Sequence, residues 1–184
     1  THCTFFTRQG FSFQVVSSDE HLANTPVRTG HRGYHPRIAN ACPICDSVAR
    51  AGRGEHPRLI APLRHGLLVL GDNQACEGWC VLLLNRHIEH MADLPLNVQE
   101  EVFGDCARAA NAIRAVFGPV RINYECLGNQ VAHVHWHLIP RHADDPEPRQ
   151  PVWGWGPERL RGRASEARRD EIVRLIRAAL DKAC

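Results

Sequence analysis

Between residues 131 and 139 the chain alternates between histidines and apolar side chains. The histidines are His133, His135 and His137, and the apolar residues beside them are Val134, Trp136 and Leu138. Successive side chains of a β-strand point to opposite faces, so this pattern predicts a strand with all three imidazoles on one face. The apolar face can pack on a core, while the other face carries imidazoles roughly 7 Å apart, which is two residues of strand rise. The pattern therefore indicates a functional site.

Other apolar runs predict three more strands. Residues 65–73 and 78–87 are rich in leucine and valine, and a short connection containing glycine and asparagine separates them. This arrangement is typical of two buried antiparallel strands. Residues 120–127 form another candidate strand, which a tight Leu-Gly-Asn connection joins to 131–139.

Helical periodicity is clearest over residues 97–118. Asn97 is a candidate N-cap with Glu100 three residues later, and Gly118 followed by proline ends the pattern. A second amphipathic helix is expected over 165–183. Strands, a long helix and then more strands indicate an α+β fold with a mainly antiparallel sheet.

A chain of 184 residues is long enough for one domain with additional segments. Residues 1–41 are mostly polar apart from the alternating stretch 11–16, so we expect an N-terminal arm that is partly disordered or adds one strand. The main domain is expected over 42–145. Residues 146–184 then form a C-terminal extension that carries the second helix.

The composition narrows the class of protein. A net charge of +2, from 22 Lys and Arg against 20 Asp and Glu, gives no reason to expect a nucleic-acid partner, and no apolar run is long enough to span a bilayer. The chain has eight cysteines and shows no signal segment at its N-terminus. We therefore expect a cytoplasmic protein with reduced thiols.

Cys42 and Cys45 have the spacing at which two thiolates on a turn can bind one tetrahedral zinc ion, although a redox-active dithiol uses the same spacing. A zinc site needs two more ligands, and the candidates that follow or form strands are His87, His90 and His133. A site with His87 and His90 would be a free-standing, zinc-ribbon-like site. A site with His133 would join the metal to the row of histidines.

Three motifs together resemble the histidine triad superfamily of nucleotidyl hydrolases and transferases. They are HVHWHLIPR at 133–141, CPIC at 42–45 and LLLNRHIEHMADL at 82–94. The resemblance implies a HIT-like fold, in which a long helix packs on a mainly antiparallel five-stranded sheet. It also implies one structural zinc ion per chain, whose ligands would be Cys42, Cys45, His87 and His133.

The same resemblance assigns roles within the row of histidines. His135 corresponds to the nucleophile of the family, and His137 corresponds to the histidine that contacts the phosphate. Family members commonly carry Gly-Gln before the first triad histidine, whereas this chain has Gly128-Asn129 with Gln130 next. Asn129 is therefore the expected phosphate contact, through a shorter amide arm.

Asp72 and Asn123 complete the candidate substrate-binding residues, together with Gln130 and His137. Asp72 falls near the position of an acidic residue that contacts the ribose hydroxyls in the family. Its spacing to His87 is one residue short, and a turn residue within Gly-Asp-Asn is the alternative interpretation.

These residues permit covalent nucleotidyl transfer. A neutral imidazole is a good nucleophile at physiological pH, so His135 would attack the α-phosphorus of a nucleotide, and water would then release the nucleoside monophosphate. The resemblance implies a homodimer and a substrate such as a dinucleoside polyphosphate or a phosphoramidate. Two alternatives stay open, namely a nucleotide-binding or interaction module of the same fold with little turnover, and a zinc-ribbon-like interaction protein. No aromatic residues are interleaved on a basic face, which argues against binding of nucleic acid.

Overall fold

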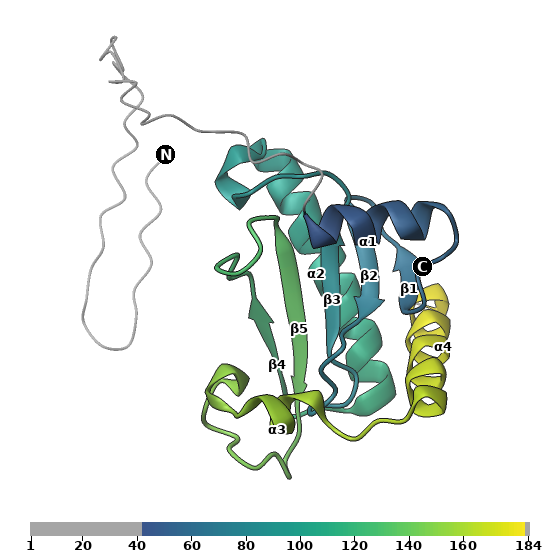
Figure 1. Ribbon diagram of the computed structural model, residues 1–184, viewed down its shortest axis with the longest axis vertical. Helices are drawn as coiled ribbons and strands as arrows, with labels where there is room; N and C mark the ends of the chain where they lie inside the picture. The colour runs from purple at the N-terminus through teal and green to yellow at the C-terminus, as the bar shows by residue number, and fades with distance from the viewer. Residues whose placement is uncertain (1–41, 183–184) are drawn as a thin grey trace, which may run out of the picture. The chain divides into compact units, whose positions relative to one another are not determined.

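The computed structural model describes residues 42–182 (Figure 1). The expected N-terminal arm, with its candidate strand 11–16, lies outside the described residues, as do the last two residues of the chain. Within 42–182 no helix is both long enough and apolar enough to cross a membrane.

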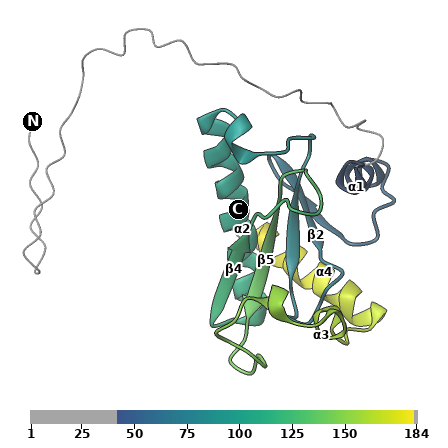
Figure 2. The ribbon, with the colours of Figure 1, turned by 60° about the vertical axis from the view of Figure 1, so that its left-hand side comes forward.

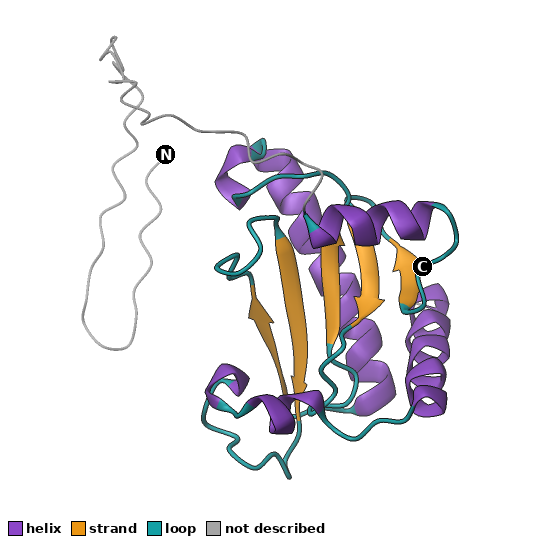
Figure 3. Ribbon diagram, viewed as in Figure 1, coloured by secondary structure: helices purple, strands orange, loops and turns teal. Residues whose placement is uncertain are grey.

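Five strands of the described chain form one sheet in the order β1-β2-β3-β5-β4, and every pair of neighbours is antiparallel (Figure 3). The strands are β1 (Leu59–Pro62), β2 (Gly66–Leu70), β3 (Cys80–Leu84), β4 (Arg121–Glu125) and β5 (His135–Arg141). The apolar runs 65–73 and 78–87 correspond to β2 and β3, which pair as expected. The predicted α+β fold with an antiparallel five-stranded sheet is confirmed.

β1 is the strand that the hydrophobic pattern did not predict. It is four residues long and ends on Pro62, which an outer strand tolerates because proline has no backbone N–H to donate. Its register against β2 shifts between Leu59 and Ala61. A strand this short and irregular leaves no clear alternation in the sequence.

The strand that carries the histidines is shorter than predicted. β5 begins at His135 and not at residue 131, because the backbone N–H of His133 donates to the carbonyl of Val131 in a tight turn. The alternation of faces holds in spite of this turn. The apolar members that pack in one core cluster are Val134, Trp136 and Leu138.

The two long helices are close to their predicted positions. α2 (Leu96–Phe117) is the central helix, and α4 (Glu166–Lys182) is the C-terminal helix. The predicted N-cap of α2 is wrong, because the carbonyl of Pro95 already accepts the first helical hydrogen bonds and Asn97 lies inside the first turn. Gly118 ends α2 as expected, at a φ of 55° in the left-handed region that favours glycine.

Different parts of the chain cover the two faces of the sheet. α2 and α4 pack on one face, and the side chains that α4 adds to this core are Ile172, Val173, Ile176 and Leu180. The other face packs against α1 (Pro43–Gly52) and against Val152 and Trp155 of the C-terminal extension. α1 and α2 lie on opposite sides of the sheet (Figure 2). The histidines belong to the face under α1, which we call the triad face.

Candidate functional site

Four side chains from three segments of the chain gather at one end of the triad face. The potential ligand atoms of Cys42, Cys45, His87 and His133 all lie within 4.8 Å of one another. Cys42 is the N-cap of α1 and Cys45 lies in its first turn, whereas His87 follows β3 and His133 precedes β5. The structure thus brings together the four ligands that the resemblance implies. His90, which a ribbon-like site would need, is exposed and is not part of the cluster.

The distances within the cluster fit a tetrahedral zinc ion. Sγ of Cys42 lies 3.4 Å from Nδ1 of His133, and Sγ of Cys45 lies 3.4 Å from Nδ1 of His87 and 3.5 Å from Nδ1 of His133. Tetrahedral bonds of about 2.3 Å to sulfur and about 2.05 Å to nitrogen would separate these atoms by roughly 3.6 Å. Two thiolates and two imidazoles fill the four positions, so the residues fit a structural zinc site.

The outer nitrogen of His133 is placed as a zinc ligand requires. Nε2 of His133 donates to the carbonyl oxygen of Leu84 at 3.0 Å, which leaves Nδ1 unprotonated toward the thiols. Nε2 of His87 lies 3.9 Å from a carboxylate oxygen of Glu89. His133 is buried, and burial lowers its pKa, so the ring is held in the neutral form that binds metals.

His135 is the next histidine along the triad face, and the backbone fixes its tautomer. Nδ1 of His135 lies 2.6 Å from the carbonyl oxygen of His133. Since a carbonyl oxygen only accepts, Nδ1 carries a proton, and in the neutral ring the lone pair is therefore on Nε2. The side chain is half-buried. His135 is therefore arranged as a nitrogen nucleophile that needs no additional base.

His137 has the opposite tautomer. Nε1 of Trp79 donates to Nδ1 of His137 at 3.2 Å. An indole N–H only donates, so Nδ1 holds the lone pair and the neutral ring carries its proton on Nε2. Burial, with a smaller contribution from His135, lowers the pKa of His137 to about 4. At neutral pH this ring is an uncharged hydrogen-bond donor.

Two tryptophans that the sequence did not predict complete the surroundings of His137. Trp153, in the 3-10 helix η3 (Val152–Gly154), packs edge-on against His137 and Trp79, with ring centroids 5.1 and 5.4 Å apart. Its Nε1 donates to the carboxylate of Glu125. The only signal for Trp79 was its place inside the predicted strand 78–87, because the sequence does not reveal the register between strands. No pattern pointed to Trp153.

The candidate substrate-binding residues fall in different places. Asn123 lies on β4 opposite Ile139 and accepts a hydrogen bond through Oδ1 from Nη1 of Arg141 at 3.0 Å. Asn129 and Gln130 are exposed in the loop that joins β4 to His133. Asn123 therefore lies on the triad face, whereas the other two lie in an exposed loop and, among the described residues, make no hydrogen bond with the triad.

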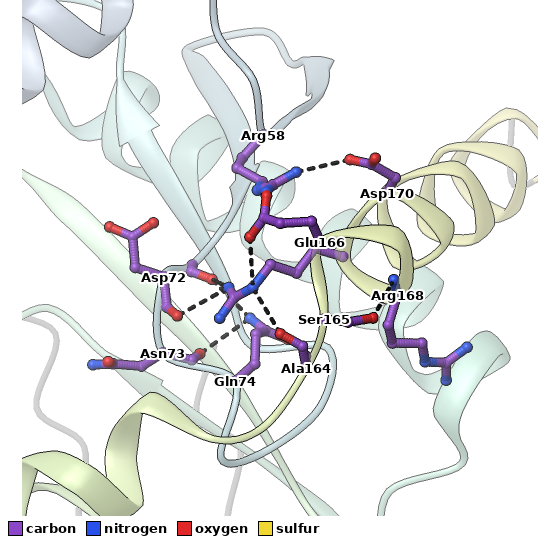
Figure 4. A network of polar contacts seen from close by, with 11 residues as sticks. Arg58, Asp72, Asn73, Gln74, Ala164, Ser165, Glu166, Arg168 and Asp170 are labelled. Atoms are coloured by element: carbon purple, nitrogen blue, oxygen red, sulfur yellow. Dashed lines mark hydrogen bonds and ion pairs between the residues drawn. The ribbon is translucent and has the colours of Figure 1, made fainter.

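Asp72 lies in the connection between β2 and β3, and the C-terminal extension holds its backbone. Nη1 of Arg169 donates to the carbonyl of Asp72 at 3.0 Å, and the backbone N–H of Gln74 donates to the carbonyl of Arg161 at 3.2 Å. Figure 4 shows the polar contacts around Asp72, and the Asp72 carboxylate points away from them. The carboxylate is exposed and makes no hydrogen bond within residues 42–182. The structure does not bring Asp72 into contact with the triad.

Proteins of known sequence and structure are similar to this chain. Residues 58–144 match the HIT domain family. "Protein hit" from Bacillus subtilis (strain 168) is 29% identical over 129 residues, which cover 60% of this chain and 86% of that protein. A zinc-bound histidine triad family protein from Mycobacterium smegmatis has a TM-score of 0.59 at 22% identity, over 78% of this chain and 96% of that chain. Diadenosine triphosphate hydrolase from Plasmodium falciparum, in complex with cyclomarin A, has a TM-score of 0.53 at 16% identity, over 68% and 78%.

Proposed function

Because this chain belongs to the histidine triad (HIT) superfamily, we propose that it is a nucleotide hydrolase or transferase that acts through a covalent nucleotidyl-histidine. Its substrate is a dinucleoside polyphosphate, another nucleoside polyphosphate or a nucleoside phosphoramidate, and it releases a nucleoside monophosphate. The similarity to a protein named as a diadenosine triphosphate hydrolase supports this substrate class.

The observation that carries the proposal is the pair of opposite tautomers on one strand. His135 has a lone pair at Nε2, and His137 has a proton at Nε2, while the ring centroids are 5.1 Å apart. Attack on a phosphorus atom requires a nucleophile and, beside it, donors for the charged equatorial oxygens. The two rings supply one of each without any change in protonation before the reaction.

The reaction has two displacement steps. In the first, Nε2 of His135 attacks the α-phosphorus, the bond to the leaving atom breaks, and the leaving group departs with the electron pair. Nε2–H of His137 donates to an equatorial oxygen throughout. In the second, water attacks the same phosphorus, the phosphorus–nitrogen bond breaks, and neutral His135 is restored. The water gives up one proton, and the product is the nucleoside monophosphate.

We propose that Cys42, Cys45, His87 and His133 hold one structural zinc ion. The ion would hold these segments rigidly together. It would not bind the substrate, because four protein ligands leave no open position. The carbonyl of His133 accepts the Nδ1 proton of His135, so the backbone of a metal ligand also orients the nucleophile. The metal site and the catalytic site are thus coupled through a single residue.

The test is replacement of His135 by asparagine, assayed for monophosphate release with dinucleoside polyphosphates, nucleoside phosphoramidates and nucleoside diphosphate sugars. Turnover should fall on the order of 10³-fold or more, while nucleotide binding is retained. The matched control is His90→Asn, which changes an exposed histidine outside the site. A His135 variant within tenfold of the wild-type rate would refute the covalent route. Nucleotide binding without turnover by the wild-type protein would favour the binding module.

We also propose that two copies associate over the surface beside β4. This strand lies at the edge of the sheet. Three apolar side chains nearby are exposed: Tyr124 on β4, Leu127 just after β4 and Phe103 on α2. Trp136 packs edge-on against Phe103, and its Nε1 is buried without a hydrogen-bond partner. A second copy over this surface would cover these exposed apolar side chains and the open edge of β4. Light scattering should report two chains for the wild type and one for Tyr124→Asp.

A cytoplasmic location is part of the proposal. Six cysteines of the described residues are free thiols: Cys42, Cys45, Cys76, Cys80, Cys106 and Cys126. A reducing compartment such as the cytoplasm keeps thiols reduced, and therefore available to bind zinc. Fractionation of cells that produce the protein tests this location directly.

A further inference from the structure

Beyond His137 the triad face opens into a cavity of about 370 Å³. β4 and the end of β5 form one side of the cavity, and residues 148–151 of the C-terminal extension form its outer wall. The polar side chains that line the cavity include Arg121, Asn123, Glu125, Arg141 and Arg149. A cavity of this volume lies within the range of small-molecule sites.

The register of the outer strands puts this cavity beside the catalytic histidines. Opposite residues of an antiparallel pair share a face, and Glu125 is the partner of His137 in the β4–β5 pair. The next two positions on this face of β4 are Asn123 and Arg121, and each step along the strand is roughly 7 Å. The cavity therefore extends from His137 in the direction away from the zinc ligands.

Arg141 builds the wall of the cavity and has its donors engaged. Nε donates to Asp145 at 2.6 Å, Nη1 donates to the Gln150 carbonyl at 2.9 Å, and Nη2 donates to the Glu147 carbonyl at 3.0 Å. Nη1 also donates to Oδ1 of Asn123 at 3.0 Å. The charge of Arg141 is thus balanced by Asp145, and the NH₂ group of Asn123 remains as a donor.

Arg121 and Arg149 differ from Arg141. Both side chains are exposed, and neither guanidinium has a hydrogen bond or an ion pair within the described part of the chain. The carboxylate of Glu125 lies at the His137 end and already accepts the indole N–H of Trp153. The far end of the cavity therefore has excess positive charge and unused N–H donors.

We propose that this cavity receives the leaving group of the substrate and selects leaving groups that carry phosphates. This inference rests on the proposed function, because a leaving group exists only if an α-phosphate is attacked. A guanidinium binds a phosphate through two parallel hydrogen bonds, and Arg121, Arg149 and the Asn123 amide together present such donors. A dinucleoside polyphosphate keeps phosphates on its leaving group, whereas the leaving group of a phosphoramidate is an amine. The cavity therefore favours dinucleoside polyphosphates over phosphoramidates.

The first test is the ratio of kcat/KM for diadenosine triphosphate to kcat/KM for adenosine 5′-phosphoramidate. In a double variant with Arg121→Ala and Arg149→Ala, this ratio should fall at least tenfold, mainly through a higher KM for the polyphosphate. Arg174→Ala is the matched control, because it removes an exposed arginine from α4 on the opposite face of the sheet. Equal losses for both substrates, or an unchanged ratio, would overturn the proposal.

A second test needs no turnover. Calorimetric titration with inorganic pyrophosphate should show binding to the full-length wild-type protein and to the Arg174 control, and at least tenfold weaker binding to the double variant. Equal binding by all three would contradict the role of Arg121 and Arg149. If no nucleotide is turned over but the pyrophosphate result holds, the proposed catalysis fails while the phosphate site stands. Circular dichroism of each variant verifies that it is folded.

Discussion

The two ends of the triad face are built by different means. At one end, Cys42, Cys45 and two histidines converge from short segments beside α1, β3 and β5, and their spacing fits one metal ion. At the other end, His137 is held by Trp79 and by a tryptophan of the C-terminal extension. The first end gathers four side chains that could hold a metal ion, and the second lowers the pKa of an imidazole through burial beside an indole donor.

Comparison of the two ends shows how three histidines at alternate positions of one segment acquire different roles. The three triad histidines point to one face of the sheet, yet the second nitrogen of each ring meets a different partner. A carbonyl accepts from His133 and another accepts from His135, while an indole donates to His137. The partner decides whether a ring presents a lone pair or a proton. The strand sets the direction of each side chain. The partner of its second nitrogen, which comes from β3 for His133 and from the residue two positions earlier for His135, sets the tautomer.

The largest expected effect is at the zinc end. Replacing Cys45 by serine removes one of four ligands, so metal analysis should find the zinc lost, and the free energy of unfolding should fall by more than about 4 kcal/mol. Cys126→Ser is the matched control, because Cys126 is a half-buried cysteine outside the cluster. Retention of about one zinc ion per chain in folded Cys45→Ser protein would show that Cys45 is not a zinc ligand.

A smaller effect is expected at the tryptophan end when the pH is lowered. The pKa of His137 is about 4 in the folded protein, against a usual value of 6.5, so the unfolded chain binds more protons between these values. Stability is therefore lost as the pH falls from 6.5 toward 4. Between about pH 7 and pH 5, the wild type should lose about 2 kcal/mol more than His137→Gln in urea unfolding. Parallel pH profiles for both proteins would show that burial does not suppress the charge on His137.

The smallest effect concerns the indole donor itself. Trp79→Phe removes the N–H that donates to His137, so the pKa of His137 should rise toward its usual value and turnover should fall about tenfold, or about 1.4 kcal/mol. Nuclear magnetic resonance of the imidazole signals measures the pKa. Trp155→Phe is the matched control, because Nε1 of Trp155 has no hydrogen-bond partner. An unchanged pKa in Trp79→Phe would mean that the indole does not control the protonation of His137.

The sequence predicted the parts of this site that depend on local periodicity and spacing. The alternation around His135 predicted which side chains share a face, and the C-x-x-C motif predicted two thiols on one turn. The resemblance implied His133 as a ligand, and the geometry brings it to the thiols while leaving His90 outside. The start of β5 was misplaced, because a tight turn at His133 depends on a backbone hydrogen bond that no periodicity records.

The rest of the site depends on contacts between segments far apart in the chain. Trp79 reaches His137 because β3 and β5 are neighbours in the sheet, and Trp153 reaches it because the C-terminal extension folds back over the triad face. Neither register nor the return path of a loop can be read from one sequence. β1 was missed for a local reason, since four residues ending in a proline carry no alternation.

In the proposed mechanism, Nε2 of His135 forms a bond to the α-phosphorus. The most direct test is to quench the wild-type protein in neutral denaturant during turnover of a radiolabelled dinucleoside polyphosphate and to map the labelled peptide by mass spectrometry. We expect the wild-type protein to carry a nucleoside monophosphate adduct on His135 that is labile in acid and stable in base. We expect no adduct in His135→Asn. His137→Gln should still form the adduct, at a lower rate. Turnover without an adduct, or an adduct on another residue, would contradict the account.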